Sequence, residues 1–137
     1  MIIKLNSNIP SYDYILVSFD VTSLFTKVPI NDLLNFLKPE LDNNSENFPL
    51  NSDTIIELIK ICVIDSKFTF NEKYYKQKFG LSMGNPLSPV LSNLYMEFFE
   101  KYILSNIKDE NIVWLRYIDD VLCLWPKATP IIPFLIS

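Results

Sequence analysis

The chain has 137 residues, a formal net charge of -4 and a hydrophobic content of 49%. This composition is typical of a packed globular domain and excludes a disordered chain. The absence of histidine excludes Ser-His-Asp and Cys-His catalysis as well as His-ligated metals, and two glycines are too few for a dinucleotide-binding fingerprint or a phosphate-binding P-loop.

Other bulk features narrow the class of protein further. No apolar run reaches the roughly 18 residues that a membrane span requires, and the first residues lack the order of a secretory signal, so we expect an intracellular protein, in nucleus or cytoplasm, without membrane contact. Cys62 and Cys123 lie far apart in apolar surroundings, which favours reduced core residues. The acidic balance argues against a free-standing nucleic-acid binder, which normally carries a basic surface.

The first predicted elements are a strand and a helix. Residues 14–19 are almost continuously apolar, which favours a strand buried on both faces. Leucine and isoleucine then recur at helical spacing over residues 30–37. Asn31 or Asp32 is the expected N-cap of this helix, and Pro39 is expected to end it.

A polar surface loop and a second helix are predicted next. The loop covers residues 39–51, which are rich in Asn, Asp and Pro. The helix begins at Ser52 or at Thr54, where Thr54 and Glu57 form a capping box. Its apolar side chains recur at helical spacing, and we expect it to end at about Asp65.

The middle of the chain predicts a hairpin, a loop and a long helix. Residues 67–70 and 73–76 have strand composition and flank a polar Asn-Glu pair, which indicates a short β-hairpin. Residues 80–89 contain both glycines and form a rigid, turn-rich loop. Ser88 is the expected cap of the following helix. Apolar side chains repeat along that helix, and we interpret them as a core face.

A second β-hairpin is predicted between Ile112 and Trp125, with Asp119 and Asp120 at its tip. Two adjacent carboxylates in an apolar setting repel each other, so they need either a solvated turn or a cation. Asp is suited to a tight turn by itself. Asp20, however, also ends a predicted strand. A lone Asp there is usually a cap or turn former, but two strands that deliver acid to one sheet edge would form a site for hard divalent cations.

The elements follow the order strand, two helices, hairpin, long helix, hairpin. This order predicts an α+β fold with a small, mainly antiparallel sheet and helices packed on one face. No repeat or internal domain boundary interrupts the chain.

Three stretches of the sequence resemble one known pattern in the same order. They are residues 19–25 (FDVTSLF), 80–89 (GLSMGNPLSP) and 117–120 (YIDD). In this order they resemble motifs A, B and C of the reverse transcriptase palm, which would cover residues 14–125. Any one of these motifs alone is weak, whereas their order and spacing are specific. Within that superfamily, three stretches are most similar to Penelope-like retroelements: residues 20–29 (DVTSLFTKVP), Met83–Gly84 and residues 114–120 (WLRYIDD).

The resemblance implies a palm that catalyses nucleotidyl transfer with two metal ions. Asp20, Asp119 and Asp120 match the catalytic carboxylates, which would bind two Mg²⁺ or Mn²⁺ ions together with the backbone carbonyl of Val21. The implied reaction adds a dNTP to the 3′-hydroxyl of a primer on an RNA or DNA template. A nucleotide cyclase of related palm architecture fits less well, because its Gly-Gly-Asp/Glu turn is missing.

The resemblance also assigns residues to the substrates. Phe25 matches the steric gate that selects a dNTP by clashing with a ribose 2′-hydroxyl, although an ordinary core residue is the alternative. Gly84 would let the backbone approach the incoming nucleotide, with Met83 and Asn85 bordering it. Tyr117 would lie near the primer end.

Parts of the family pattern are absent from this sequence. Fingers would precede motif A, whereas a thumb and, in Penelope-like elements, an endonuclease domain complete the protein. We therefore expect residues 1–13 and 126–137 to be truncated flanks, and the chain alone to show little or no processive polymerisation. The alternative is a catalytically inactive remnant that at most packs against protein or contacts nucleic acid.

Overall fold

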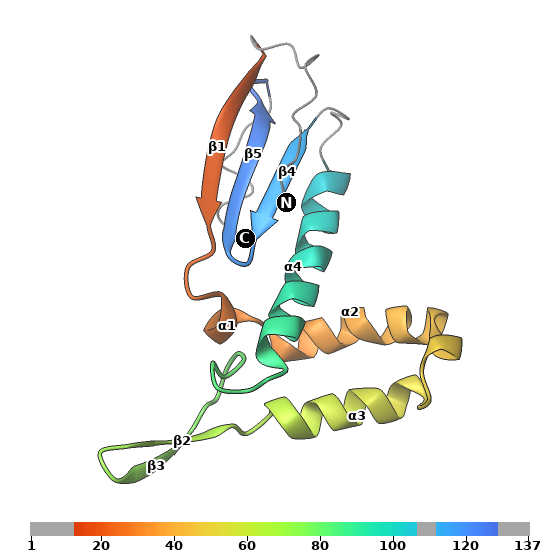
Figure 1. Ribbon diagram of the computed structural model, residues 1–137, viewed down its shortest axis with the longest axis vertical. Helices are drawn as coiled ribbons and strands as arrows, with labels where there is room; N and C mark the ends of the chain where they lie inside the picture. Colours follow the sequence, from red (N-terminus) through yellow and green to blue (C-terminus); the bar gives the residue numbers. More distant parts are fainter. Residues whose placement is uncertain (1–12, 107–111, 129–137) are drawn as a thin grey trace. The chain divides into compact units, whose positions relative to one another are not determined.

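The computed structural model describes residues 13–106 and 112–128, and Figure 1 shows the order of its elements. The chain forms two compact units. We call residues 1–22 and 101–137 the sheet unit, and residues 23–100 the helical unit. The predicted flanks, except Asp13 and residues 126–128, lie outside the described residues.

The sheet unit contains a three-stranded antiparallel sheet. Its strands lie in the order β1 (Tyr14–Asp20), β5 (Asp120–Pro126) and β4 (Val113–Tyr117). β4 and β5 form the predicted hairpin. The central strand β5 therefore pairs on both sides, and β1 lies at an edge.

The two faces of this sheet differ in burial because side chains alternate along a strand. One face carries Val121, Cys123 and Trp125, which are 1–2% exposed. The rings of Phe19 and Trp114 stack over this face with centroids 6.1 Å apart, and Phe19 also contacts Trp125 edge-on. The other face is largely exposed.

The prediction that the first strand is buried on both faces is therefore wrong. None of its residues is fully buried, and Leu16 is 68% exposed. The continuous apolar run carries no information on which face is covered. An edge strand of a small sheet can keep one apolar face open.

The helical unit contains the other elements. They are α1 (Leu24–Lys27), α2 (Ile30–Asn43), the 3-10 helix η1 (Ser45–Asn47), α3 (Ser52–Val63), the hairpin strands β2 (Lys67–Phe70) and β3 (Lys73–Lys76), and α4 (Ser88–Ser105), whose last turn belongs to the sheet unit. The β2–β3 hairpin is confirmed with the predicted bounds. Helices and small antiparallel sheets together confirm the α+β class.

Helix α2 differs from its prediction at both ends. Pro29 occupies the N-cap position in place of Asn31 or Asp32. The helix also passes through Pro39 and ends at Asn43, so the predicted loop is shorter and includes η1. Proline inside a helix costs about 3 kcal/mol. Continuation places Leu41 on the buried face with three leucines of the preceding turns, Leu33, Leu34 and Leu37.

The cap of α3 is Asn51, not Ser52 or Thr54. The Asn51 side-chain oxygen accepts a hydrogen bond from the Thr54 N–H at 2.8 Å. Ser52 is buried and donates instead to Asp42 of α2. The helix ends at Val63, before the predicted Asp65, because the next residue, Ile64, already has an extended backbone with a ψ of 141°.

Two further expectations need correction. Ser88 lies in the first turn of α4, and its hydroxyl donates to the Ser82 carbonyl at 2.6 Å, so it fixes the preceding loop and is not the cap. Cys123 is buried as predicted, but Cys62 is exposed. On α3 the buried residues Ile56 and Val63 lie on one face of the helix. Cys62 lies on a different face and is therefore exposed.

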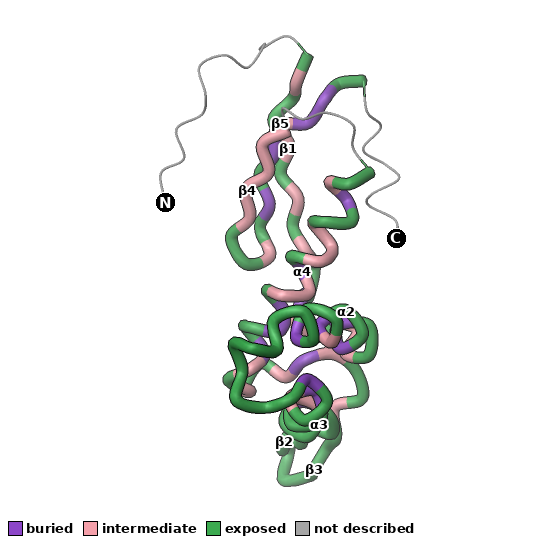
Figure 2. Tube along the Cα trace, turned by 90° about the vertical axis from the view of Figure 1, so that its right-hand side faces the viewer, coloured by how far each residue is buried: buried purple, intermediate pink, exposed green. Residues whose placement is uncertain are grey.

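Figure 2 maps burial along the chain and shows buried stretches of α2 and of β5. Part of the predicted core stripe of α4 is solvent-exposed. Leu91, Met96 and Ile103 are buried, whereas Tyr102 is 70% exposed. Among the helices that the structure describes, none combines the length and the apolar character needed to cross a membrane.

Candidate active site

The backbone of three aspartates, Asp20, Asp119 and Asp120, lies at one end of the three-stranded sheet. Asp20, the last residue of β1, lies directly opposite Asp120, the first residue of β5. The N–H of Val21 donates to the carbonyl of Asp119 at 3.1 Å and extends this pairing into the turn. Residues opposite each other in an antiparallel ladder project from the same face. Asp20 and Asp120 therefore share the exposed face of the sheet.

The turn that carries Asp119 has an unusual backbone. Ile118 and Asp119 connect the paired residues Tyr117 and Asp120, and Ile118 has a left-handed φ of 58°. A β-branched residue in this region costs roughly 1–2 kcal/mol. If turn chemistry explained the aspartates, one of them would occupy the left-handed position. Ile118 occupies it instead, so turn formation alone does not account for two carboxylates here.

Arg116 supports this turn, a role that the sequence did not indicate. Its guanidinium donates to the carbonyl of Ile118 at 3.1 Å. The contact satisfies a carbonyl at the strained residue and fixes the turn from the β4 side. The only signal in the sequence for this contact is that Arg116 lies two residues before Ile118. This signal is weak, because a long side chain at that spacing can reach many other acceptors.

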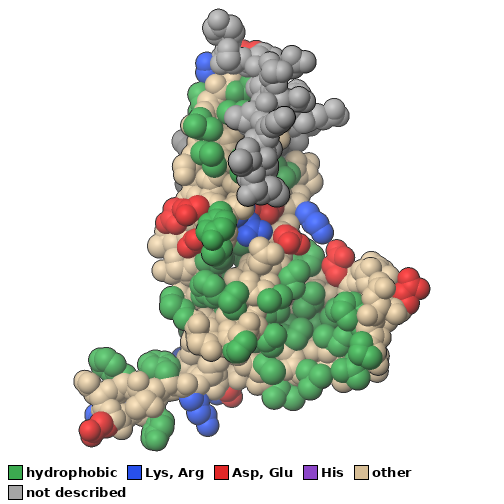
Figure 3. All heavy atoms as spheres, viewed as in Figure 1, with side chains coloured by type: hydrophobic (Ala, Val, Ile, Leu, Met, Phe, Trp, Pro, Cys, Tyr) green, Lys and Arg blue, Asp and Glu red, His purple; other side chains and the backbone are tan. Residues whose placement is uncertain are grey.

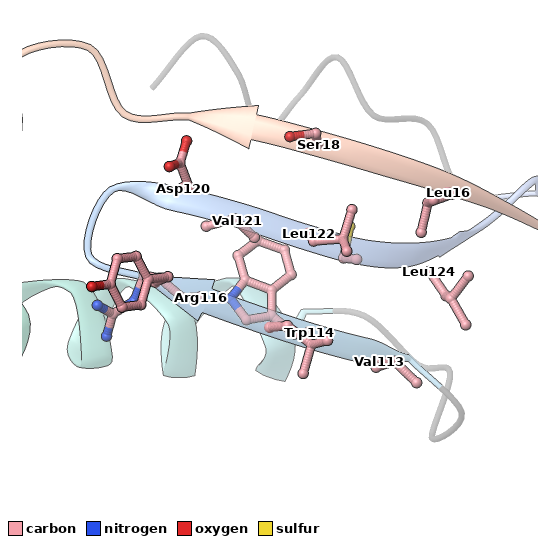
Figure 4. A pocket seen from close by; sticks show the side chains of 12 residues that line it. Leu16, Ser18, Val113, Trp114, Arg116, Asp120, Val121, Leu122 and Leu124 are labelled. Carbon is pink, nitrogen blue, oxygen red and sulfur yellow. The ribbon is translucent and has the colours of Figure 1, made fainter. Parts of the chain in front are cut away.

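The exposed face of the sheet is hollowed beside the aspartates. The hollow has a volume of about 610 Å³ and extends from the turn, at Tyr117 and Asp120, along Leu122 to Leu16. Figure 4 shows Asp120 at the turn end of this hollow, and Leu16 and Leu124 toward its other end. Tyr117, predicted to lie near the primer, is 77% exposed. It pairs directly with Asp120 and so lies on the same face.

The donor set of this edge suits a hard divalent cation. Carboxylate and carbonyl oxygens are the ligands that Mg²⁺ and Mn²⁺ prefer. Within residues 13–106 and 112–128, no three acidic or cysteine side chains are already gathered around one metal position. The strand pairing places the backbone of Asp20, Asp119 and Asp120 at one end of the sheet, and their residue types fit the cation.

The predicted nucleotide-binding residues lie in the helical unit. Met83, Gly84 and Asn85 line a hollow of about 860 Å³ there. Met83 is 78% exposed, and no atom lies within 4 Å of the position that a Cβ of Gly84 would take. The backbone at Gly84 is thus open to close approach.

Asn85 has a structural role that the sequence did not indicate. Its side-chain nitrogen donates to the carbonyl of Cys62 at 2.6 Å, and its side-chain oxygen accepts from the N–H of Leu87 at 2.9 Å. These bonds hold the loop between α3 and α4. Asn85 therefore borders the hollow through its backbone and its fixed side chain.

Phe25 is tied to the same loop. It is half-buried on α1, and its carbonyl accepts a hydrogen bond from the N–H of Leu81 at 2.7 Å. Gly80, just before, has a φ of 70°, and a Cβ there would lie 2.3 Å from the backbone of Thr26. Motif A and motif B residues are thus joined in this unit by a close contact that only glycine permits.

Comparison with known proteins identifies the family. The model of the family "Reverse transcriptase (RNA-dependent DNA polymerase)" matches residues 3–132. The chain belongs to the reverse transcriptase family. The match covers all three motifs and both units.

A curated protein and a solved structure are similar to parts of the chain. The chain is 22% identical over 94 residues to a Saccharomyces cerevisiae protein named for COX1/OXI3 intron 2, with 69% of the chain and 10% of that protein covered. Its fold is similar to apo telomerase from Candida tropicalis truncated from the C-terminal domain, with a TM-score of 0.63 and 18% identity over 80% of this chain and 24% of that chain. The palm-like α+β fold is thus confirmed, and the chain spans about a tenth and a quarter of these two proteins.

Proposed function

We propose that this chain is the palm of an RNA-directed DNA polymerase, which adds a dNTP to a primer 3′-hydroxyl on an RNA or DNA template. The observation that carries the proposal is the edge at which Asp20 faces Asp120 and Val21 bonds to Asp119. In a member of this family, acid from two neighbouring strands at one exposed edge supports phosphoryl transfer with two metal ions as the reaction.

The carboxylates would bind the catalytic ions. Asp20, Asp119 and Asp120 are the proposed ligands of two Mg²⁺ or Mn²⁺ ions, with the carbonyl of Val21 as a further donor. When bound, such ions polarise the attacking hydroxyl and neutralise the charge of the triphosphate. The strained turn at Ile118, fixed by Arg116, would hold Asp119 at the edge so that little reorganisation is needed on binding.

The exposed face of the sheet would receive the primer. Tyr117 offers an exposed ring beside Asp120, and Leu16 and Leu122 offer apolar surface along the same hollow. Sugars and bases pack on such surfaces, whereas the phosphates would stay in solvent. This arrangement would direct a primer end toward the carboxylates.

The helical unit would select the incoming nucleotide. The open backbone of Gly84, with Met83 and the fixed Asn85 beside it, would border the base and sugar. Phe25 would act as the steric gate that excludes a ribose 2′-hydroxyl. The bond from Leu81 to Phe25 would hold the gate on the same loop.

The origin of the chain is a finer proposal. The sequences of residues 20–29 and 114–120, together with Met83 before Gly84, support a Penelope-like retrotransposon as the source. The family model covers the wider class of reverse transcriptases. The subfamily therefore rests on these residues alone.

The metal site can be tested by thermal unfolding during a Mn²⁺ titration. A cation that binds the folded state raises the unfolding midpoint as its concentration increases. We expect this rise for the native chain and for the control Glu46→Gln, whose side chain lies on the exposed 3-10 helix. We expect no rise for Asp119→Asn. Equal behaviour of Asp119→Asn and the native chain would contradict the assignment.

The alternative function is that of a catalytically inactive chain that at most packs against protein or contacts nucleic acid. Single-nucleotide primer extension with Mn²⁺ separates the two. Incorporation that Asp20→Asn abolishes supports the polymerase, whereas binding of primer and template without incorporation supports the second function.

A further inference from the structure

The β2–β3 hairpin has no described covering on either face. Every residue of both strands is exposed, and Figure 2 shows the hairpin in the exposed colour throughout. Asn71 and Glu72 form its two-residue turn with φ values of 49° and 60°, which match a type I′ turn. In Figure 1 the hairpin extends from the helical unit beyond the end of α3. A lone two-stranded ribbon is marginal in water, so its exposed apolar surface needs an explanation.

Aromatic rings cover both faces of this ribbon. Phe68 lies opposite Tyr75, and their rings stack with centroids 5.5 Å apart. Phe70 continues the same face, with its ring 6.5 Å from that of Tyr75. On the opposite face Tyr74 is 85% exposed. Figure 3 shows hydrophobic side chains on both sides of the hairpin. A contiguous patch of exposed aromatic rings is typical of a binding surface.

The ribbon is also the basic part of an acidic chain. Residues 67–78 hold four lysines and one glutamate, a charge of +3, whereas the whole chain carries -4. Lys67 lies opposite Lys76, and only Lys76 has an ion pair there, with Asp65 at 2.5 Å. None of the ion pairs within the described residues involves Lys67, Lys73 or Lys78. Like charges opposite each other repel, and a bound polyanion would relieve this repulsion.

The base of the hairpin borders the proposed nucleotide site. Lys67, Phe68 and Gln77 line the same 860 Å³ hollow as Met83 and Gly84. The hollow lies within the helical unit. A strand that lies along the ribbon could therefore continue to the loop of Gly84.

We propose that the β2–β3 hairpin is a stacking platform for single-stranded nucleic acid. Bases stack on Phe70 and Tyr75 of one face, beside Lys73, and on Tyr74 of the other face, beside Lys67; the two lysines contact phosphates. Alternating rings and lysines are the surface that binds single strands without sequence preference. The identity of the strand as the template rests on the proposed polymerase function, whereas binding of the strand to the hairpin does not. A protein partner is less well matched, because its surface would have to neutralise the unpaired lysines.

Fluorescence anisotropy of a labelled oligo(dT) strand with the full chain in EDTA tests the platform. We expect Tyr74→Ala to weaken binding by roughly five- to a hundredfold, the usual effect of losing one stacked base. Tyr74→Phe keeps the ring and should bind like the native chain. Tyr102→Ala removes a tyrosine of similar exposure on α4 and is the matched control.

A charge series gives an independent measurement. Lys73→Gln should weaken binding and lower the salt dependence by about 0.7 in log K against log salt, the value for one phosphate contact to a single strand. Lys60→Gln on α3 is the control, because Lys60 pairs with Glu57 at 2.7 Å. Circular dichroism melts show that each variant keeps its fold.

Three results would overturn the proposal. The first is equal affinity of Tyr74→Ala and Tyr102→Ala for oligo(dT), and the second is equal affinity of the native chain for oligo(dT) and for duplex DNA. The third is a chain that binds no oligonucleotide but self-associates, with Tyr74→Ala removing the self-association; this result would assign the hairpin to a protein interface. The proposed polymerase fails separately. Asp119→Asn should keep oligo(dT) binding in EDTA. A native chain that binds oligo(dT) but shows no rise of its unfolding midpoint with Mn²⁺ rejects the catalytic proposal and leaves the platform.

Discussion

Gly80 and Gly84 lie four residues apart in one loop, and their surroundings impose opposite requirements. A Cβ at Gly80 would lie 2.3 Å from the backbone of Thr26, and its φ of 70° is unfavourable for other residues, whereas the Cβ position at Gly84 is open. We expect Gly80→Ala to lower the free energy of unfolding by more than about 1 kcal/mol. Gly84→Ala should leave it nearly unchanged. Urea unfolding of both variants checks this, and equal losses would contradict it.

Ile118 allows a test of strain in the acidic turn. Glycine adopts a φ of 58° without steric cost, so Ile118→Gly should raise the free energy of unfolding by up to about 1 kcal/mol, less the loss from greater unfolded-state entropy. We expect the same variant to reduce nucleotide incorporation, because the position of Asp119 becomes less fixed. Denaturant midpoints and primer extension measure the two effects. A large loss of stability would show that the Ile118 side chain is needed for packing.

The two cysteines differ in a way that pH reveals. Burial raises the pKa of the Cys123 thiol from 9.0 to about 11. In the unfolded chain this thiol loses its proton first, so stability is present below pH 9 and falls as pH rises toward 11. The unfolding midpoint should therefore drop more steeply in the native chain than in Cys123→Ala. Parallel profiles would contradict this. At neutral pH a thiol reagent should label only the exposed Cys62 until denaturant is added.

At the scale of elements, α2 shows how packing overrides a local signal. Pro39 lies inside the helix and removes one backbone hydrogen bond, while Leu41 beyond it is buried. Pro39→Ala restores the donor, so we expect the free energy of unfolding to rise by about 1–3 kcal/mol. Leu41→Ala should lower it by about 2–5 kcal/mol. Urea unfolding measures both, and destabilisation by Pro39→Ala would show that proline is favoured there.

The strands show which element-scale features a pattern can predict. Both hairpins were predicted because short apolar runs flank tight polar or acidic turns. The burial of β1 was not, because an apolar run contains no signal for its position at a sheet edge. The same limit applies to the cap of α3. Asn51, Ser52 and Thr54 are all good capping residues, and the bond from Ser52 to Asp42 decided among them.

At the scale of the whole molecule, charge restricts where nucleic acid binds. The chain has an isoelectric point of about 4.7, so most of its surface repels phosphates. If Lys67 and Lys73 supply the contacts, log K for oligo(dT) should fall against log salt with a slope of about -1.4. Anisotropy titrations at several salt concentrations measure it. A slope near zero would mean that ionic contacts do not contribute, and a much steeper one that other lysines take part.

The sequence alone determined the family and the identity of the acidic residues. Three short motifs in order, with carboxylates at predicted strand ends, are local features that are visible in the chain itself. The sequence also excluded histidine-based chemistry by composition. These inferences need no knowledge of which segments meet.

Tertiary structure decided the features that depend on distant residues. The register that sets Asp20 opposite Asp120, the contact of Gly80 with Thr26, and the left-handed turn at Ile118 all follow from pairing between separated segments. Exposure of the β2–β3 hairpin is of the same kind, because its apolar rings read in sequence as an ordinary strand pair. Propensity and periodicity act within a few residues, whereas burial and strand register are set by whichever surfaces the rest of the chain supplies.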